Sequence, residues 1–241
     1  MKVYKVKDYQ ELSKKSASIV AEQIKLKSNS ILGLATGSTP EGMYKELIEL
    51  YEKNIVDFSD VTTFNLDEYY GLYPEDSQSY NYYMRKHLLN HINIKEENIN
   101  IPNGMAEDIE KSCEEYENKI KELGGIDLQL LGIGRNGHIG FNEPSDSFET
   151  YTRLVELDID TINANSRFFA SLEEVPTKAI SMGIQTIMNA KKILLIASGE
   201  SKAKTIYDTI KGPITPSVPA SILQLHKDVT IIVDEEAGKL L

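Results

Sequence analysis

The sequence is poor in cysteine and has no long apolar run. Cys113 is the single cysteine among 241 residues, so an internal disulfide is impossible and a reducing compartment is expected. No stretch approaches the roughly 18 uncharged apolar residues of a membrane-spanning helix, and residues 1–8 lack the apolar core of a signal peptide. We therefore expect a cytoplasmic protein without a membrane partner.

Positive charge is also scarce. The chain has 26 lysines and arginines against 37 aspartates and glutamates, which gives a formal net charge of −11. A surface this acidic repels nucleic acid and anionic lipid, so neither is an expected partner. A small anionic substrate is compatible with this charge, provided that its pocket supplies local positive charge or backbone N–H donors.

Hydrophobic residues are instead arranged in short continuous runs, which are typical of parallel strands covered on both faces. Five runs predict strands, at residues 31–35, 61–66, 128–131, 193–197 and 229–233. Amphipathic stretches around them predict helices, at residues 8–27, 41–51, 79–91, 108–123, 177–190 and 201–210. This alternation predicts one α/β domain over residues 1–241 with a mostly parallel sheet, in which ligands bind at the carboxyl ends of the strands.

The loop after the first run, residues 36–40, has the composition of a phosphate cradle. Gly37 permits a close approach of the backbone to a ligand, and Ser38 and Thr39 add hydroxyls to the free N–H groups of a helix N-terminus. Pro40 suits the first helical position, and Thr39 can cap the helix. Simple helix capping explains the same residues, so both interpretations stay open.

An acidic segment follows the second run. Asp67 comes directly after residue 66 and is followed by Glu68. A carboxylate at the carboxyl end of a strand is well placed to act as a general base. An acidic turn is the more ordinary interpretation of this segment taken alone.

A glycine-rich loop follows the third run and contains one histidine and one glutamate. His138 can take and give a proton near neutral pH, and Glu143 can hold one imidazole nitrogen and fix its tautomer. The loop also contains a formal G-x-G-x-x-G, but residues 141–144 (FNEP) are a poor helix, so a dinucleotide site is not expected. A catalytic loop is preferred over a polar glycine turn.

Two cations are further candidates in this acidic chain. Arg167 stands beside two phenylalanines, and Lys202 follows the run at residues 193–197. Either could bind a phosphate, although a solvated surface cation is the commoner role. His87 and His91 have the i, i+4 spacing of zinc ligands, but the sequence offers no evident third ligand, so no metal is expected.

Five segments resemble glucosamine-6-phosphate deaminases, in order and over nearly the whole chain. They are residues 34–40 (LATGSTP), 64–69 (FNLDEY), 131–144 (LGIGRNGHIGFNEP), 164–169 (ANSRFF) and 220–226 (ASILQLH). The resemblance implies a three-layer α/β/α Rossmann-like domain that converts glucosamine 6-phosphate and water to fructose 6-phosphate and ammonia. It implies no cofactor and no metal, because proton transfers suffice.

The resemblance also implies roles for single residues. Asp67 would move a proton between C2 and C1, while His138, supported by Glu143 and position 136, would open the pyranose ring. The substrate phosphate would be held by Gly37, Ser38, Thr39, Arg167 and Lys202. Many relatives carry aspartate where this chain has Asn136. An amide cannot share the negative charge that stabilises an imidazolium, so Glu143 must supply more of it.

Other functions are compatible with parts of the pattern. A 6-phosphogluconolactonase-like hydrolase or a pentose-phosphate isomerase would have a related fold, but the lactonases lack the continuation at residues 142–144 and the motif at residues 65–69. A non-catalytic sugar-phosphate sensor, as the effector half of a transcription regulator, would need a DNA-binding module, for which this chain has no spare length.

The resemblance bears on regulation as well. The hexameric relatives are activated by an N-acetylated sugar phosphate, carry lysine and threonine where this chain has Val155 and Glu156, and continue beyond the position of Leu241. Glu156 would repel an anionic effector, and Val155 offers it no donor. We therefore expect no such activation, and a monomer or small homo-oligomer whose partner is a small amino-sugar phosphate.

Overall fold

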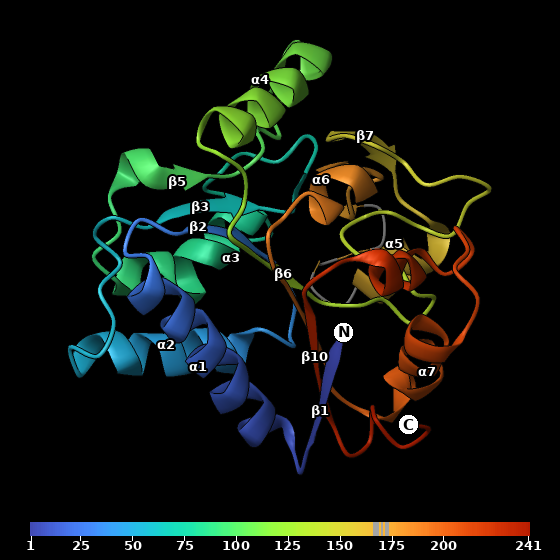
Figure 1. Cartoon of the computed structure of the whole chain (residues 1–241). Coiled ribbons are helices and arrows are strands. Elements are labelled where there is room, and N and C mark those ends of the chain that lie inside the picture. Colours follow the sequence, from blue (N-terminus) through green and yellow to red (C-terminus); the bar gives the residue numbers. More distant parts are fainter. Residues whose placement is uncertain (166–168, 170, 172–173) are drawn as a thin grey trace.

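The computed structural model describes residues 1–165, 169, 171 and 174–241, and its framework is a pair of β-sheets (Figure 1). Every strand of the larger sheet is parallel to its neighbours, in the spatial order β1 (Lys2–Val6), β10 (Val229–Asp234), β9 (Ile193–Ala197), β6 (Leu128–Leu131), β2 (Ile31–Leu34), β3 (Thr62–Asn65) and β5 (Ile99–Asn100). The smaller sheet is antiparallel and consists of β4 (Asp67–Tyr69), β8 (Lys178–Ser181) and β7 (Arg153–Glu156). The prediction of a mostly parallel sheet is therefore confirmed.

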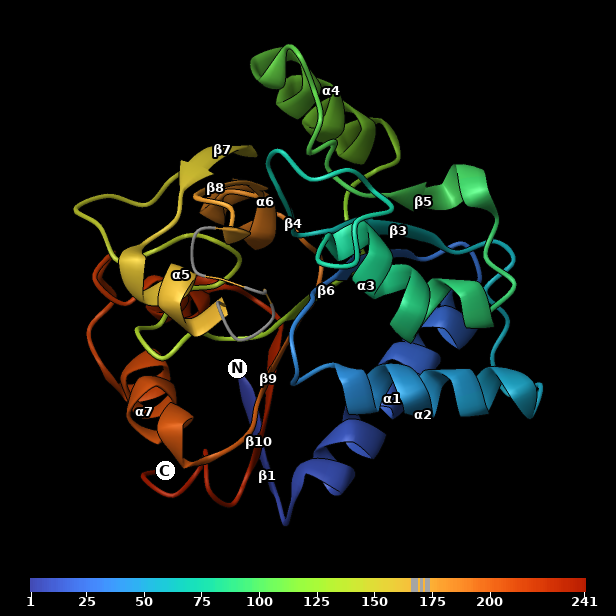
Figure 2. The same ribbon diagram turned by 180° about the vertical axis from the view of Figure 1, so that it is seen from behind.

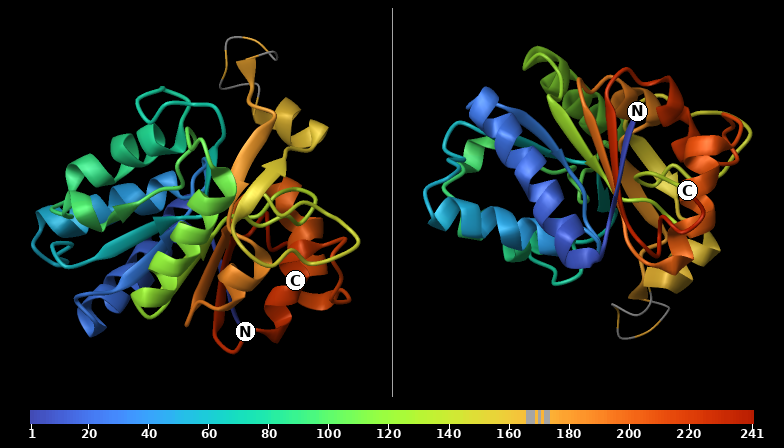
Figure 3. Two further views of the ribbon diagram at one scale, coloured as in Figure 1. Left: turned by 90° about the horizontal axis from the view of Figure 1, so that it is seen from above. Right: turned by 60° about the horizontal axis from the view of Figure 1, so that its bottom comes forward.

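Helices cover the larger sheet on both sides, which completes three layers (Figure 3). One side carries α1 (Tyr9–Leu26), α2 (Glu41–Glu52) and α3 (Tyr80–His87), and the other carries α6 (Ile184–Met188) and α7 (Ala203–Lys211). In addition, α4 (Ile109–Glu122) packs against β7, and α5 (Ile159–Asn165) follows β7 in the chain. Short 3-10 helices cover Leu89–His91, Glu96–Asn98, Glu200–Lys202 and Pro219–Leu225. Among the described helices, none is long and apolar enough to cross a membrane.

Two hydrophobic clusters hold these layers together. The main cluster lies between the larger sheet and its helices and contains the fully buried strand β9. The second cluster joins the smaller sheet to the glycine-rich loop, and its buried members are Tyr69, Phe141, Val155, Leu157 and Ala179. The continuous apolar runs of the sequence therefore correspond to strands buried on both faces.

Local capping explains where three of the described helices begin. Asp8, Asp108 and Ser79 precede α1, α4 and α3, and each side chain accepts a backbone N–H from the first turn. α2 begins at Glu41 as predicted, but the predicted capping is wrong, because Pro40 is the residue before the helix and no side chain caps it. Thr39 thus does not act as the cap, and its carbonyl lies 3.0 Å from the hydroxyl of Tyr9.

Two predicted helices differ from the structure. Residues 177–190 form β8 and then the short helix α6, separated by Gly183. A Cβ at Gly183 would lie 2.3 Å from the carbonyl oxygen of Thr150. The regular structure is therefore interrupted at Gly183, where the backbone passes close to the backbone of Thr150. The helix predicted at residues 79–91 ends at His87, because Leu88 leaves helical geometry with φ −148° and a 3-10 turn follows.

Asp127 ties together the amino ends of three central strands. It precedes β6, and its carboxylate accepts the N–H of Ile31 at the start of β2 at 2.8 Å. Lys27 and Lys191 reach the same carboxylate at 2.6 and 2.7 Å, and Lys191 precedes β9. Burial raises the pKa of Asp127, but these hydrogen bonds outweigh that effect and hold the pKa below its ordinary value. This end of the sheet lies opposite the carboxyl ends where ligands bind.

Asp127→Asn should lower the free energy of unfolding by about 1–3 kcal/mol at pH 7, because an amide cannot accept both lysines and the N–H as an anion does. A lowered pKa stabilises the fold above the unfolded pKa of about 4, so the difference should vanish as pH falls through the folded pKa. Urea denaturation at pH 7 and at about pH 3 measures both.

The matched control is Asp60→Asn, which removes an exposed ion pair of 3.6 Å with Lys95. Its effect should stay within about 0.5 kcal/mol. Equal losses for the two variants at pH 7 would contradict the role assigned to Asp127.

Candidate active site

The loops predicted to carry chemistry leave neighbouring strands of the larger sheet. β9, β6, β2 and β3 lie side by side, and their carboxyl ends lead to Lys202, His138, Gly37 and Asp67. The chain passes from β2 outward to β3 and β5, then returns to β6 on the other side of β2, so the strand order reverses between β2 and β6. Parallel α/β sheets bind ligands at such a switch point, which places the candidates at one edge.

Asp67 lies in a strand and not in the loop or turn expected after β3. The chain changes sheets at Leu66, whose carbonyl accepts the N–H of Met182 at 2.8 Å, and Asp67 then pairs opposite Ser181. This arrangement leaves Asp67 only 7% exposed. Burial raises the pKa of Asp67 to about 8, and the adjacent charge of Glu68 adds to the rise. A buried carboxyl with a pKa near neutrality is suited to proton transfer.

Glu68 holds the start of α3 against β4 (Figure 2). Its carboxylate accepts the backbone N–H groups of Tyr69, Tyr80 and Asn81, each at 2.8 Å. Burial raises the pKa of Glu68 to about 7, although the three N–H groups oppose the rise. The two adjacent carboxyls thus face different partners, and only Asp67 faces the glycine-rich loop.

The glycine-rich loop brings His138, Glu143 and Asn136 together. His138 Nδ1 lies 3.1 Å from Glu143 Oε2, and Asn136 Nδ2 donates to the same oxygen at 2.7 Å. Asn136 Oδ1 accepts the backbone N–H of His138 at 3.2 Å. The Asn136 amide therefore donates through its nitrogen and accepts through its oxygen. An ionised aspartate at this position could not donate the hydrogen bond to Glu143.

The environment of Glu143 favours its charged form and so defines the tautomer of His138. Burial raises the pKa of Glu143, but hydrogen bonds from His138, Thr161 and Asn136 outweigh it and hold the pKa below the ordinary value. An ionised carboxylate only accepts, so the proton of the neutral imidazole lies on Nδ1 and Nε2 can act as a base. A Cβ at Gly134 would lie 2.3 Å from the imidazole, so glycine there allows the ring to pack on the loop.

One row of the smaller sheet holds the glycine-rich loop over Asp67. Asp67, Ser181 and Arg153 lie opposite one another across β4, β8 and β7, so their side chains share one face. Loop residues 140–142 follow this row. A Cβ at Gly140 would lie 3.8 Å from Asp67 Oδ2, the Phe141 N–H donates to Ser181 Oγ at 2.9 Å, and Arg153 Nη1 donates to Asn142 Oδ1 at 3.1 Å. Asp67 therefore lies beside Gly140, a loop residue that is two positions after His138 in the chain.

The loop after β2 has its carbonyl groups occupied by tyrosines. The hydroxyl of Tyr9 lies 3.0 Å from the carbonyl oxygens of both Ser38 and Thr39, and Tyr83 donates to the carbonyl of Gly37 at 2.7 Å. Gly37 has φ +103°, a conformation that other residues rarely adopt. The N–H groups of residues 37–39 bond to no described residue, which leaves them available to an anion.

The two predicted cations have different outcomes. Lys202 Nζ donates to the carbonyl of Ile133 at 2.6 Å, so it lies beside the first residues of the glycine-rich loop. Arg167 lies outside the described residues, and its contact with a phosphate stays a prediction. Of the two histidines with zinc-like spacing, His87 lies against Tyr83 with ring centroids 4.4 Å apart.

No motif in the sequence marks several polar residues that complete the site. Ser181 and Arg153 come from strands that the hydrophobic pattern does not predict, and Thr161 comes from α5, which it does not predict either. Tyr80 lies close to Thr36 of the loop after β2, and its ring stacks on Phe141 of the glycine-rich loop with centroids 6.1 Å apart. Ser79 as a helix cap indicates that Tyr80 is the first residue of α3, but it does not predict what the side chain of Tyr80 contacts.

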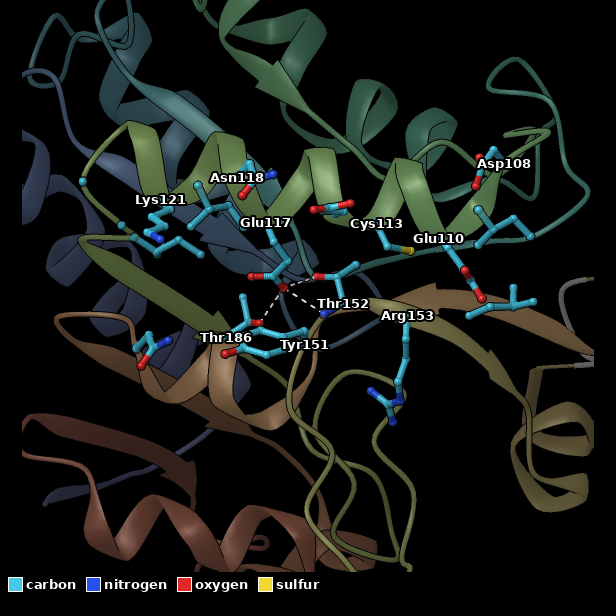
Figure 4. Close-up of a pocket in the computed structure, with 18 of the residues that line it drawn as sticks. Asp108, Glu110, Cys113, Glu117, Asn118, Lys121, Tyr151, Thr152, Arg153 and Thr186 are labelled. Atoms are coloured by element: carbon cyan, nitrogen blue, oxygen red, sulfur yellow. Dashed lines mark hydrogen bonds between the residues drawn. The ribbon is translucent and has the colours of Figure 1, made fainter.

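A separate cleft of about 1360 Å³ opens between α4, the start of β7 and α6 (Figure 4). Figure 4 shows the carboxylate of Glu117 directed at Thr152 and Thr186, whose hydroxyls both donate to it at 2.6 Å. The lining includes Arg153 but none of the candidate catalytic residues. The cleft is therefore distinct from the strand-end loops that carry the candidates.

Known proteins match this chain over nearly all of its length. The family model for glucosamine-6-phosphate isomerases/6-phosphogluconolactonase matches residues 7–232. The chain belongs to this family. A protein of Clostridium novyi (strain NT) named glucosamine-6-phosphate deaminase is 62% identical over 241 residues, which is 100% of both chains. A protein of the same name from Thermoanaerobacter sp. (strain X514) is 61% identical over 100% of this chain and 95% of its own.

Solved structures of the family have the same fold. A structure described as a monomeric glucosamine-6-phosphate deaminase has a TM-score of 0.97 and 49% identity and covers 100% of both chains. A 6-phosphogluconolactonase from Trypanosoma cruzi has a TM-score of 0.79 with 22% identity, covering 100% of this chain and 96% of its own, and so shows the fold alone. The chain is an enzyme of this family with its α/β architecture.

Ser181→Ala should loosen the glycine-rich loop from the smaller sheet. The substitution leaves the N–H of Phe141 buried without its acceptor, so the free energy of unfolding should fall by about 1–3 kcal/mol and this N–H should exchange faster. Urea denaturation and hydrogen exchange measure the two effects. The exposed Ser28→Ala is the control and should stay within about 0.5 kcal/mol. Unchanged protection of the Phe141 N–H in the variant would refute the contact.

Proposed function

We propose that the chain is a glucosamine-6-phosphate deaminase, which converts glucosamine 6-phosphate and water to fructose 6-phosphate and ammonia. One observation carries the proposal: a buried carboxyl, Asp67, lies against the same loop that holds the His138–Glu143 pair. The reaction needs two separate proton-transfer groups, one at oxygen and one at carbon, and this site offers both. The names of relatives about 60% identical support the assignment.

Ring opening is the first step, because the hydrogen at C2 becomes acidic only when C1 is an aldehyde. His138 Nε2 takes the proton of the anomeric hydroxyl, and the C1–O5 bond breaks as the ring oxygen receives a proton from the imidazolium. Glu143 stabilises the imidazolium through Nδ1, at 3.1 Å, in the way that a buried carboxylate supports a catalytic histidine. Asn136 contributes by orienting Glu143 and not by sharing negative charge.

Asp67 acts in the second step. The carboxylate takes the proton from C2, which gives an enolamine, and returns a proton to C1, which leaves an iminium at C2. In the free enzyme the raised pKa of Asp67, about 8, favours the protonated acid near neutral pH. The ammonium group of the bound substrate adds a positive charge nearby and so favours the ionised carboxylate when it is needed.

Hydrolysis completes the reaction. Water adds to the C2 iminium and ammonia leaves, so one water is consumed and the enzyme is a hydrolase. The phosphate is held by the N–H groups of Gly37, Ser38 and Thr39 and by the charges of Lys202 and Arg167. These steps need no cofactor or metal. A phosphorylated sugar is an intracellular metabolite, so the proposal includes a cytoplasmic location.

A 6-phosphogluconolactonase-like activity is less consistent with the site. Lactone hydrolysis needs an activated water but no proton transfer at carbon, which leaves the buried Asp67 without a role. Ammonia release from glucosamine 6-phosphate, measured beside hydrolysis of 6-phosphogluconolactone, separates the two. We expect one ammonia for each fructose 6-phosphate. Lactone turnover without ammonia would reject the proposal, and tight binding without any turnover would indicate a sensor.

Asp67→Asn should abolish turnover while substrate affinity stays near normal, because the amide keeps the shape of the side chain and cannot accept the C2 proton. The same variant should be more stable at high pH. The folded pKa of about 8 lies above the unfolded value near 4, so ionising the buried carboxyl destabilises the wild type as pH rises between them. Above pH 8 the variant should be more stable by several kcal/mol, because each unit between the two pKa values corresponds to about 1.4 kcal/mol, and at pH 4 the gain should be almost nothing.

Ammonia assays, equilibrium binding and urea denaturation at pH 5 and pH 9 check these effects. Near-normal ammonia release by the Asn variant would remove Asp67 as the base. A stability difference independent of pH would show that the carboxyl is not buried as an acid.

The proposal also includes a lack of effector activation and a monomer or small oligomer. In β7, Val155 is buried, and Glu156 is exposed with an ion pair of 3.8 Å to Lys178. Neither side chain can bind an anion. The solved relative described as monomeric supports a small assembly. Hyperbolic kinetics should be unchanged by N-acetylglucosamine 6-phosphate, and light scattering should give a small species. Sigmoidal curves that become hyperbolic with that compound would disprove this.

A further inference from the structure

Thr161 contacts the carboxylate that orients His138, although none of the steps above uses it. It lies in α5, the residue is 7% exposed, and its Oγ1 donates to Glu143 Oε1 at 2.6 Å. The other oxygen of Glu143, Oε2, accepts from Asn136 and faces His138. The two oxygens of one carboxylate are therefore held from two different parts of the chain.

The third donor restricts Glu143 in a way that the other two do not. Asn136 and His138 bind the same oxygen, and the terminal torsion of a glutamate is broad. A carboxylate held only at Oε2 can therefore turn about its last carbon–carbon bond. The hydroxyl of Thr161 on Oε1 fixes the carboxylate plane, and an imidazole bonded to a fixed carboxylate keeps its other nitrogen in one direction.

We propose that Thr161 is a positioning residue for ring opening, because its hydroxyl fixes the Glu143 carboxylate so that His138 presents Nε2 to the reacting oxygens of the sugar. This inference rests on the proposed function, since ring opening is a step of that reaction. Thr161 touches no reacting atom in it and acts through Glu143 and His138.

The same contact has an electrostatic consequence. Among the described residues, His138 is the ionisable group that acts on Glu143, and Thr161 adds an uncharged donor from α5. From β7, Arg153 binds the neighbouring Asn142. A hydrogen bond to a carboxylate favours its ionised form. Loss of the Thr161 bond should therefore raise the pKa of Glu143.

Two substitutions separate the hydroxyl from the packing of the side chain. Thr161→Val removes the hydroxyl and keeps the branched shape, whereas Thr161→Ser keeps the hydroxyl. We expect the Val variant to lose about tenfold in kcat with little change in KM. The acid limb of its pH profile should move to higher pH, because Glu143 must be ionised to support the imidazolium. The Ser variant should keep the wild-type profile.

The chain offers a matched control in Thr186→Val. Thr186 is also a buried threonine whose hydroxyl donates to a glutamate at 2.6 Å, but its partner is Glu117 in the cleft beside α4. This variant should leave kcat and the pH profile unchanged while losing a similar hydrogen bond. Thr161→Ala also removes the hydroxyl, and it replaces Thr161→Val in these measurements if the valine variant does not fold.

An NMR spectrum of the imidazole nitrogens reports on this contact without any turnover. The chain has four histidines, and His138→Gln identifies the signal of His138. In Thr161→Val and Thr161→Ala the Nε2–H tautomer of the neutral ring should appear beside the Nδ1–H tautomer, whereas Thr161→Ser and Thr186→Val should keep the Nδ1–H tautomer alone. The wild-type tautomer and wild-type kinetics in the Val and Ala variants, or a loss of stability alone, would overturn the inference.

The two proposals fail in different ways. A wild-type enzyme that releases no ammonia would refute the proposed function. A changed His138 tautomer in the Thr161 variants of the same protein would still support the hold of Thr161 on the Glu143–His138 pair. Full ammonia release with the wild-type tautomer in the variants would refute the role of Thr161 alone.

Discussion

The candidate site depends on the hydrogen bonds between the smaller sheet and the glycine-rich loop. Asp67 comes from β4, whereas His138 follows β6, and neither segment determines the position of the other by local structure. The bonds from Phe141 to Ser181 and from Arg153 to Asn142 hold the loop along the row that contains Asp67. Because the loop held in this way lies over Asp67, one arrangement supplies both the proximity of the two groups and the burial that raises the pKa of the carboxyl.

The two key carboxyls illustrate how environment separates chemical roles. Asp67 is buried beside another acid, so its pKa rises to about 8 and it becomes a strong base once ionised. Glu143 is also partly buried, but three donors reverse the effect and keep it charged beside His138. A pair of acids whose pKa values are moved in opposite directions is suited to sequential proton transfer. The Asn136 amide contributes to this difference in pKa, because it donates a hydrogen bond to Glu143 without adding a charge.

Stabilising and functional charges lie at opposite ends of the larger sheet. At the amino ends of the central strands, Asp127 is satisfied by Lys27, Lys191 and a backbone N–H. At the carboxyl ends, Asp67 and Glu68 are buried with raised pKa values, so their ionisation costs stability, and the proposed function uses this property of Asp67. The parallel arrangement makes this separation possible, since all strands begin at one edge and end at the other.

The sequence by itself determined the five central strands, most of the helices and the loops that carry the candidate residues, because continuous apolar runs and local spacing are encoded within short segments. Spacing within one loop was also enough to predict the pairing of His138 with Glu143. Only the tertiary structure decided that residues 178–181 form a strand, since pairing with β4 and β7 overrides the amphipathic pattern of that segment. It likewise decided the burial of Asp67 and the contacts of Thr161 and Ser181, because these depend on residues far apart in the chain that meet only when the two sheets are assembled.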